Sequence, residues 1–176
     1  GVNTISHHHT ASMVSLAFVV HEWLTCGGQD YAEQVIRNAR AFARALEERD
    51  LWVTGRHGRH TDNHQVWMAP PRACNAYELA TNLFRAGLVV NPFHPLPGHV
   101  EAGIRFGLAE PTKLGMKEDH MFALADLVAA VATGLEVPEA VAQRTKELRS
   151  GFGCAYCVPS AEVERLRSEL FARVRG

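Results

Sequence analysis

Apolar residues recur with helical spacing over much of the chain. The segment from Ala11 to Thr25 contains an apolar stretch, Met13 to Leu24, interrupted by Ser15, His21 and Glu22. It is followed by Gly27-Gly28, so we expect a helix there, capped by Thr10. A capping box at Asp30-x-x-Glu33 predicts a second helix. Its apolar stripe is Tyr31, Val35, Ala39, Phe42 and Leu46.

Shorter segments predict strands and further helices. Residues rich in β-formers occupy 51–53, 65–68, 88–90 and 103–106. Helices are expected from a second capping box, Asn75-x-x-Glu78, to Gly87, and then over 117–133, 139–149 and 160–174. The pattern predicts an α+β fold in which helices cover a small antiparallel sheet.

Composition is that of one ordinary globular core. The 176 residues are 47% hydrophobic and 21% charged, with a net charge of -1, which argues against a nucleic-acid partner. The stretch from Met13 to Leu24 is too short to span a bilayer, and no basic segment before it suggests a secretory signal. Four scattered cysteines do not form a disulfide framework, so we expect a cytoplasmic protein without a membrane partner.

Arg105 is the principal candidate for chemistry. It lies in the apolar, glycine-flanked run from Glu101 to Gly107, and a buried guanidinium is costly unless an anion meets it. A substrate carboxylate would satisfy it, with Gly103 and Gly107 leaving room for a ligand or for close backbone approach. The alternative is a structural pair with an internal acid such as Glu101.

Several ordered motifs resemble the C-terminal half of the serine hydroxymethyltransferase family, the fold-type-I pyridoxal-phosphate enzymes that include threonine aldolase and transaldolase relatives. In chain order they are the helical set Tyr31, Val35, Asn38, Ala39 and Ala43, then Thr61-Asp62-Asn63-His64, Val90-Asn91, and Gly103-Ile104-Arg105-Phe106-Gly107. The resemblance implies a small C-terminal domain over 29–176 that binds the substrate carboxylate. Residues 1–28, with a long helix, would link it to a cofactor-bearing chain or domain.

The resemblance also implies roles for individual residues. Arg105 would bind the substrate carboxylate and His64 would contact the substrate. Ser6 and His7 stand where the family has a glycine pair at the cofactor phosphate, and could supply a hydroxyl and a donor. The family's Schiff-base lysine, in a Thr-His-Lys context, is absent, so no catalytic residue is expected in this chain. Pyridoxal 5'-phosphate would be held mainly by a lysine-bearing partner, which makes the chain a fragment or one subunit of a hetero- or homo-oligomer.

The implied activity is aldol-type cleavage or transfer on a small amino acid such as glycine, serine or threonine. Val90-Asn91-Pro92 departs from the family's Val-Asn-Lys-Asn, which leaves the use of tetrahydrofolate open. One alternative is a non-catalytic assembly or regulatory partner of a lysine-bearing subunit. Another is a metal-binding module using His7-His8-His9 or Cys154-x-x-Cys157, although adjacent histidines cannot all reach one ion and a lone C-x-x-C lacks a second pair.

Overall fold

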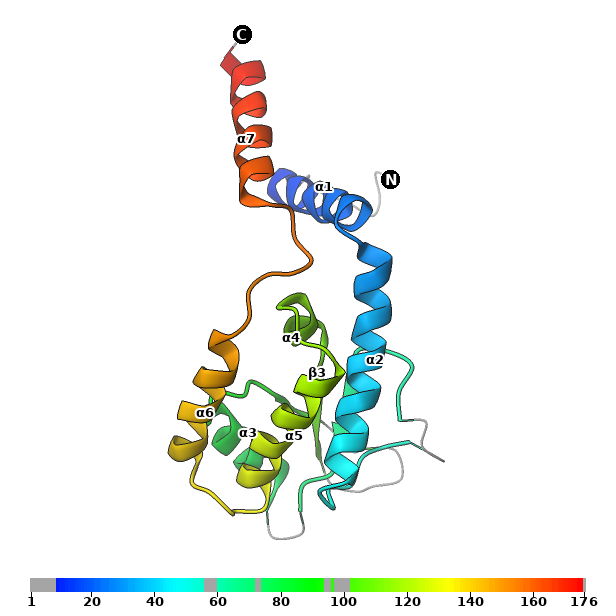
Figure 1. The fold of residues 1–176 in the computed structure, drawn as a ribbon, viewed down its shortest axis with the longest axis vertical. Helices are drawn as coiled ribbons and strands as arrows, with labels where there is room; N and C mark the ends of the chain where they lie inside the picture. The colour runs from blue at the N-terminus through cyan, green and yellow to red at the C-terminus, as the bar shows by residue number, and fades with distance from the viewer. Residues whose placement is uncertain (1–8, 56–59, 72–73, 94–95, 97–101, 176) are drawn as a thin grey trace. The chain divides into compact units, whose positions relative to one another are not determined.

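The computed structural model describes residues 9–55, 60–71, 74–93, 96 and 102–175. The chain forms two compact units (Figure 1). One unit joins Gly1–Tyr31 to Tyr156–Gly176, and the other is Ala32–Ala155. Each is described by itself below.

The first unit contains α1 (Thr10–Thr25) and α7 (Ser160–Arg175). Thr10 is the first helical residue, and the preceding His9 makes no side-chain cap, so the predicted Thr10 cap is wrong. The helix ends where predicted, because Gly27 adopts the left-handed φ of +73° that glycine tolerates best. The carboxylate of Glu22 is buried and accepts a hydrogen bond from the Val158 amide at 3.3 Å.

Helix α1 is apolar on every side and remains largely exposed in this chain. The exposed large side chains are Met13, Val14, Leu16, Phe18, Val19, Val20, Trp23 and Leu24, with Leu24 80% accessible. A helix that is hydrophobic all round is normally buried. Among the described residues, no helix combines the length and the apolar character needed to cross a membrane.

Helix α2 (Gly28–Glu47) leads into the second unit. It begins two residues before the predicted capping box, so Asp30 lies in its first turn instead of at its cap. The predicted stripe is confirmed over the second unit, where Val35, Ala39, Phe42 and Leu46 are buried.

The sheet has three antiparallel strands, β1 (Gln65–Met68), β2 (Asn91–Phe93) and β3 (Gly103–Gly107), in the order β1-β3-β2. The strand predicted over 51–53 is reduced to one isolated bridge, Val53 to Met68. The strand predicted over 88–90 begins three residues later, at Asn91. The backbone amide of Leu88 donates to the carbonyl of Leu83 at the end of α3. Leu88 therefore belongs to the connection after α3, and strand pairing starts only beyond it.

Four helices complete this unit: α3 (Ala76–Arg85), α4 (Ala109–Lys113), α5 (Glu118–Ala132) and α6 (Pro138–Ser150). The Asn75 cap is confirmed, since its side chain accepts from the Glu78 amide at 2.9 Å. The five-residue α4 was not predicted, because it is too short to display a helical period. The α+β class with an antiparallel sheet is confirmed.

The core lies between one face of the sheet and the helices. Phe42 of α2 meets Phe106 of β3 edge to face, with ring centroids 5.2 Å apart. Val66 pairs with Phe106 and Met68 with Ile104 across the β1–β3 ladder, and all four side chains are buried. Because side chains alternate along a strand, the residues between them leave from the other face.

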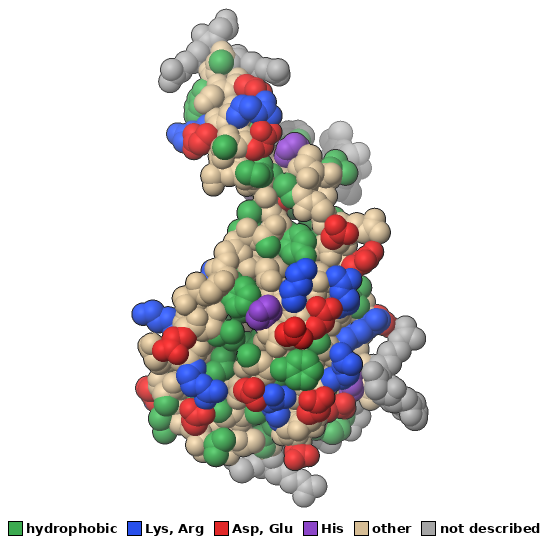
Figure 2. All heavy atoms as spheres, viewed as in Figure 1, with side chains coloured by type: hydrophobic (Ala, Val, Ile, Leu, Met, Phe, Trp, Pro, Cys, Tyr) green, Lys and Arg blue, Asp and Glu red, His purple; other side chains and the backbone are tan. Residues whose placement is uncertain are grey.

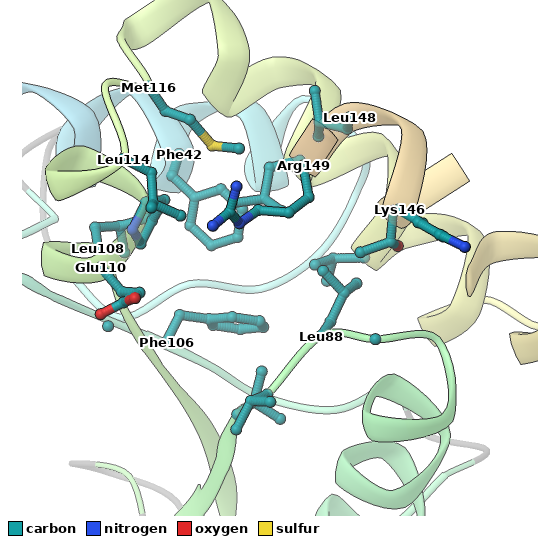
Figure 3. Close-up of a pocket in the computed structure, with 18 of the residues that line it drawn as sticks. Phe42, Leu88, Phe106, Leu108, Glu110, Leu114, Met116, Lys146, Leu148 and Arg149 are labelled. Carbon is teal, nitrogen blue, oxygen red and sulfur yellow. The ribbon is translucent and has the colours of Figure 1, made fainter. Parts of the chain in front are cut away.

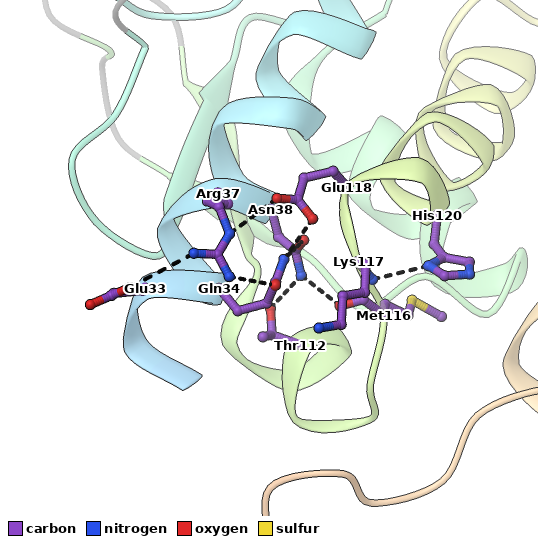
Figure 4. A network of polar contacts seen from close by, with 9 residues as sticks. All are labelled: Glu33, Gln34, Arg37, Asn38, Thr112, Met116, Lys117, Glu118 and His120. Carbon is purple, nitrogen blue, oxygen red and sulfur yellow. Dashed lines mark hydrogen bonds and ion pairs between the residues drawn. The ribbon is translucent and has the colours of Figure 1, made fainter. Parts of the chain in front are cut away.

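A buried polar network joins α2 to α4 and α5 (Figure 4). The Asn38 amide donates to the hydroxyl of Thr112 and the carbonyl of Met116, both at 2.8 Å, and accepts from Gln34 at 2.8 Å. Gln34 also donates to Glu118 at 2.8 Å, so one α2 face carries the network. Gln34, Asn38 and Thr112 are almost wholly inaccessible, which is tolerable because their polar atoms are bonded.

Candidate functional site

Arg105 is anchored in the middle of the central strand. Its neighbours Ile104 and Phe106 are buried in the core, while Arg105 itself is half-buried. Strand alternation therefore sends the guanidinium out of the sheet face opposite the core. The rigid backbone on both sides fixes where this cation stands.

Strand register surrounds Arg105 with polar neighbours. Trp67 of β1 and Asn91 of β2 are its direct cross-strand partners, so all three side chains leave the same face. Gln65 lies opposite Gly107, one step further along that face. On the sheet face away from the core, Arg105 of the central strand therefore lies between side chains of the two edge strands.

A pocket of about 480 Å³ opens on this face. It is lined by His64, Gln65, Val89, Val90, Asn91, Arg105 and Gly107. The two residues predicted to contact substrate, Arg105 and His64, therefore line one pocket although 41 positions separate them in sequence. Sequence reasoning missed Gln65, and only the β1–β3 register reveals it.

Asn91 is a direct partner of the arginine. A guanidinium can only donate, so the amide oxygen of Asn91 must face it. In that orientation the oxygen accepts from Nη2 of Arg105 at 2.8 Å, and the amide nitrogen donates to the carbonyl of Pro92 at 2.9 Å. Asn91 is a neutral partner, and this bond orients the guanidinium of Arg105.

His64 follows three turn residues whose side chains make contacts of their own outside the Arg105 pocket. The Asn63 side chain accepts a hydrogen bond from the backbone N–H of Gln65 at 2.8 Å. The Thr61 hydroxyl accepts one from the backbone N–H of Asn63 at 3.2 Å. Asp62 pairs with Arg40 at 2.6 Å. Of the four motif residues, His64 alone lines the Arg105 pocket, while the other three border a separate polar depression of about 330 Å³.

The two glycines that flank Arg105 differ in purpose. A Cβ at Gly107 would meet nothing within 4 Å, which is consistent with open space beside the pocket. A Cβ at Gly103 would lie 2.5 Å from the side chain of Leu96, so that glycine admits core packing and not a ligand. Glu101, the alternative partner of Arg105, lies outside the described residues, as do Ser6 and His7.

A second cavity, of about 440 Å³, lies on the core side of the sheet (Figure 3). Phe42, Leu88, Phe106, Leu108 and other apolar side chains line it. Arg149 extends into the cavity and donates to the carbonyl of Phe152 at 2.8 Å, whereas Lys146 points away. Its walls offer a zwitterion few polar partners, so the Arg105 pocket is the better candidate for a small amino acid.

The charges on the face drawn in Figure 2 and the metal-binding side chains of the described ranges do not indicate another kind of site. On the face drawn in Figure 2, acidic and basic side chains are interspersed, without a single-sign patch. Within the described ranges, no three His, Cys, Asp or Glu side chains are placed to hold a metal ion. Cys26 and Cys74 are free thiols.

The described residues do not by themselves fit a covalently bound aldehyde cofactor. Such a cofactor requires a lysine at the site, and none of Lys113, Lys117 and Lys146 lines the Arg105 pocket. What this part of the chain offers is an oriented cation with hydrogen-bonding neighbours. That arrangement can bind and orient a carboxylate.

Comparisons with known proteins show which enzymes the chain resembles. No family model matches the chain. The serine hydroxymethyltransferase of Methanocaldococcus jannaschii is 36% identical over 152 residues, covering 81% of this chain and 35% of the relative. The fluorothreonine transaldolase of Streptantibioticus cattleyicolor is 36% identical over 144 residues, covering 82% of this chain and 22% of the relative.

A solved structure agrees with these sequence relatives. The crystal structure of L-threonine transaldolase from Pseudomonas fluorescens superposes with a TM-score of 0.76 at 29% identity, covering 86% of this chain and 36% of that one. The chain spans about a third of the length of the serine hydroxymethyltransferases that it matches. The chain thus matches about a third of a serine hydroxymethyltransferase, and its resemblance to that family and to the threonine transaldolases is confirmed.

Proposed function

We propose that this chain supplies the carboxylate-binding part of a pyridoxal-phosphate enzyme that acts on glycine, serine or threonine by aldol-type cleavage or transfer. The observation that carries the proposal is Arg105, fixed in the central strand and directed into a polar pocket shared with His64 and Asn91. The kinship with hydroxymethyltransferases and transaldolases supports the substrate class.

Arg105 suits a carboxylate for geometric reasons. Its planar guanidinium has five N–H donors in a fixed fork and can bind both carboxylate oxygens at once. The Asn91 side chain accepts a hydrogen bond from one of these donors and thereby holds the plane of the guanidinium. Holding the carboxylate orients the bonds at the α-carbon, and this orientation decides which bond can be broken.

His64 is proposed as the second substrate contact. It stands at the start of β1, where its carbonyl is fixed by the Leu108 amide at 2.8 Å. The residue lines the same pocket as Arg105. A ring nitrogen there can form a hydrogen bond to an oxygen of the amino acid.

A lysine-bearing chain or domain is proposed as the partner, because the cofactor needs a lysine that the described pocket lacks. The exposed apolar surface of α1 supports such a partner, since eight large apolar side chains would otherwise remain in water. We propose that residues 1–28 link this chain to the partner, with Ser6 and His7 near the cofactor phosphate. The use of tetrahydrofolate as a co-substrate stays an open alternative. The free thiols of Cys26 and Cys74 fit a reducing compartment, and the cytoplasm is our proposed location.

The decisive experiment replaces Arg105 in the assembled enzyme. Arg105→Lys keeps the charge but loses the fork, so we expect a higher KM for the amino acid and a loss in kcat/KM of about tenfold to a hundredfold. Arg105→Ala should be worse and should also lower kcat, because the carboxylate is no longer oriented. Arg144→Lys is the matched control, since Arg144 of α6 pairs with Glu136 and does not line the pocket.

The rival proposal is a non-catalytic assembly partner. An assembly subunit has no need of a carboxylate contact, so parent-like kinetics in both Arg105 variants, with the complex intact, would favour it. An unchanged complex with the expected loss of activity would favour the substrate role. Sizing of each assembled variant accompanies the kinetics for this reason.

A further inference from the structure

Three side chains at the start of β1 form a directed chain of hydrogen bonds. The indole Nε1 of Trp67 donates to Oε1 of Gln65 at 3.0 Å. The amide Nε2 of Gln65 lies 3.3 Å from Nε2 of His64. Gln65 and His64 both line the Arg105 pocket, and Trp67 lies directly opposite Arg105 in the sheet.

The chemistry of Trp67 decides the direction of every bond in this chain. An indole N–H can only donate, so the Gln65 atom facing it must be the carbonyl oxygen. The remaining end of the amide is NH₂, which is also only a donor. The Nε2 atom of His64 must therefore accept, and a neutral ring then carries its hydrogen on Nδ1.

We propose that Gln65 and Trp67 are positioning residues that hold neutral His64 as the Nδ1–H tautomer. This leaves a donor, Nδ1–H, as the ring's remaining polar group, on a residue that lines the same pocket as Arg105. On the proposed function, on which this role rests, that donor meets an oxygen of the bound amino acid. The opposite tautomer would turn a lone pair toward the oxygen and repel it.

His120 provides a built-in comparison with the opposite outcome. The backbone amide of Lys117 donates to Nδ1 of His120 at 3.0 Å (Figure 4). A backbone N–H can only donate, so neutral His120 carries its hydrogen on Nε2. The same chain should therefore show two histidines in opposite tautomers.

The test is ¹⁵N NMR of the imidazole rings in the 176-residue chain at about pH 8.5, two units above the ordinary histidine pKa. Couplings from the ring protons distinguish a protonated nitrogen from a bare one. His64→Gln and His120→Gln each remove one signal set and so assign the two rings among the ten histidines. We expect Nδ1–H for His64 and Nε2–H for His120.

Substitution of Gln65 or Trp67 should change the tautomer of His64 and leave that of His120 as it is. Gln65→Glu replaces the donor by a carboxylate that accepts, so His64 should switch to Nε2–H while His120 is unchanged. Trp67→Phe removes the donor that orients the amide, and His64 should become a mixture. Should Gln65→Glu disturb the fold, seen as a change at His120, Gln65→Leu decides instead, with a mixture expected. An Nε2–H signal for His64 in the parent chain, or no response to these variants, overturns the proposal.

The assembled enzyme separates this inference from the proposed function. Gln65→Glu should raise KM for the amino acid about three- to tenfold, and Gln65→Leu by less, because the first reverses the donor and the second only frees it. If the tautomers behave as expected but neither Arg105 nor Gln65 variants change KM, the positioning is correct and the substrate role is wrong. If Arg105 variants fail in catalysis while His64 is Nε2–H, the positioning is wrong and the carboxylate role stands.

Discussion

The side chain of Leu96 occupies the space that a Cβ on Gly103 would need. Its Cγ, Cδ1 and Cδ2 atoms lie 2.5, 2.6 and 2.7 Å from that position, and Leu96 is only 2% exposed. Gly103 begins β3, two residues before Arg105. The strand that carries the candidate site therefore starts at a position where any side chain would have to displace Leu96.

Gly103→Ala is expected to destabilise the chain by about 1–3 kcal/mol, the usual cost of overpacking a core. Urea unfolding measures the change. Gly107→Ala is the matched control at the other end of β3, where a Cβ meets nothing within 4 Å, and should stay within about 0.5 kcal/mol. Strict additivity of Gly103→Ala with Leu96→Ala would contradict the proposed clash, because removing Leu96 atoms should relieve it.

Asn91→Asp should impair substrate binding more than Asn91→Ala. The alanine variant removes a neutral acceptor that orients Arg105, and KM should rise about three- to tenfold. The aspartate variant places a carboxylate where the amide oxygen now lies 2.8 Å from Nη2, so it competes with the substrate for the cation. Steady-state kinetics of the assembled enzyme give the order. An aspartate variant that binds the amino acid better than the alanine variant would show that Arg105 does not hold the carboxylate.

Glu118 should make the chain less stable as pH falls. Partial burial acts to raise the pKa of Glu118, but hydrogen bonds from Gln34 and the positive charge of Arg37 outweigh it and hold the pKa below its ordinary value. A carboxyl whose folded pKa is depressed contributes stability above its unfolded pKa and loses it as pH falls through the folded pKa.

We therefore expect Glu118→Gln to lower stability at neutral pH and to flatten its decline between about pH 5 and pH 3. Urea unfolding across that range measures both effects. Glu48→Gln, at an exposed position in the turn that follows α2, serves as the control and should keep the parental profile. Parallel profiles of stability against pH for the parent and Glu118→Gln would show that Glu118 does not cause the loss of stability at low pH.

Asn38→Ala should cost about 2–4 kcal/mol of stability. It leaves the Met116 carbonyl and the Gln34 amide without the bonds that Asn38 provides, and each unsatisfied buried group costs about 1–3 kcal/mol. Denaturant unfolding provides the value. Asn82→Ala, at a half-buried position on α3, is the comparison and should be much milder. Equal losses in the two variants would argue that the network adds nothing beyond helix packing.

Pyridoxal phosphate should not attach to one specific lysine of this chain alone, because no lysine lines the Arg105 pocket. Borohydride reduction followed by peptide mapping tests this. We expect only scattered, substoichiometric labelling of Lys113, Lys117 and Lys146. Stoichiometric labelling of one of them, with activity in the absence of any partner, would refute the need for a lysine-bearing chain.

Local patterns in the sequence determined the α+β class and most element positions. The stripe of α2, the Asn75 cap and the left-handed Gly27 depend on residues close in sequence, so spacing alone predicts them. Arg105 stood out for the same reason, as a charge inside an apolar run. The ordered motifs were enough for the family.

Tertiary structure decided what depends on pairing between distant segments. Register placed Asn91 and Trp67 beside Arg105, reduced the segment at 51–53 to one bridge, and let Gly103 admit Leu96. Asn38 matched a motif in sequence, but its partners Thr112 and Met116 lie more than 70 residues away. Such contacts have no local signature, because a one-residue change of register would exchange the faces of a strand without altering its sequence pattern.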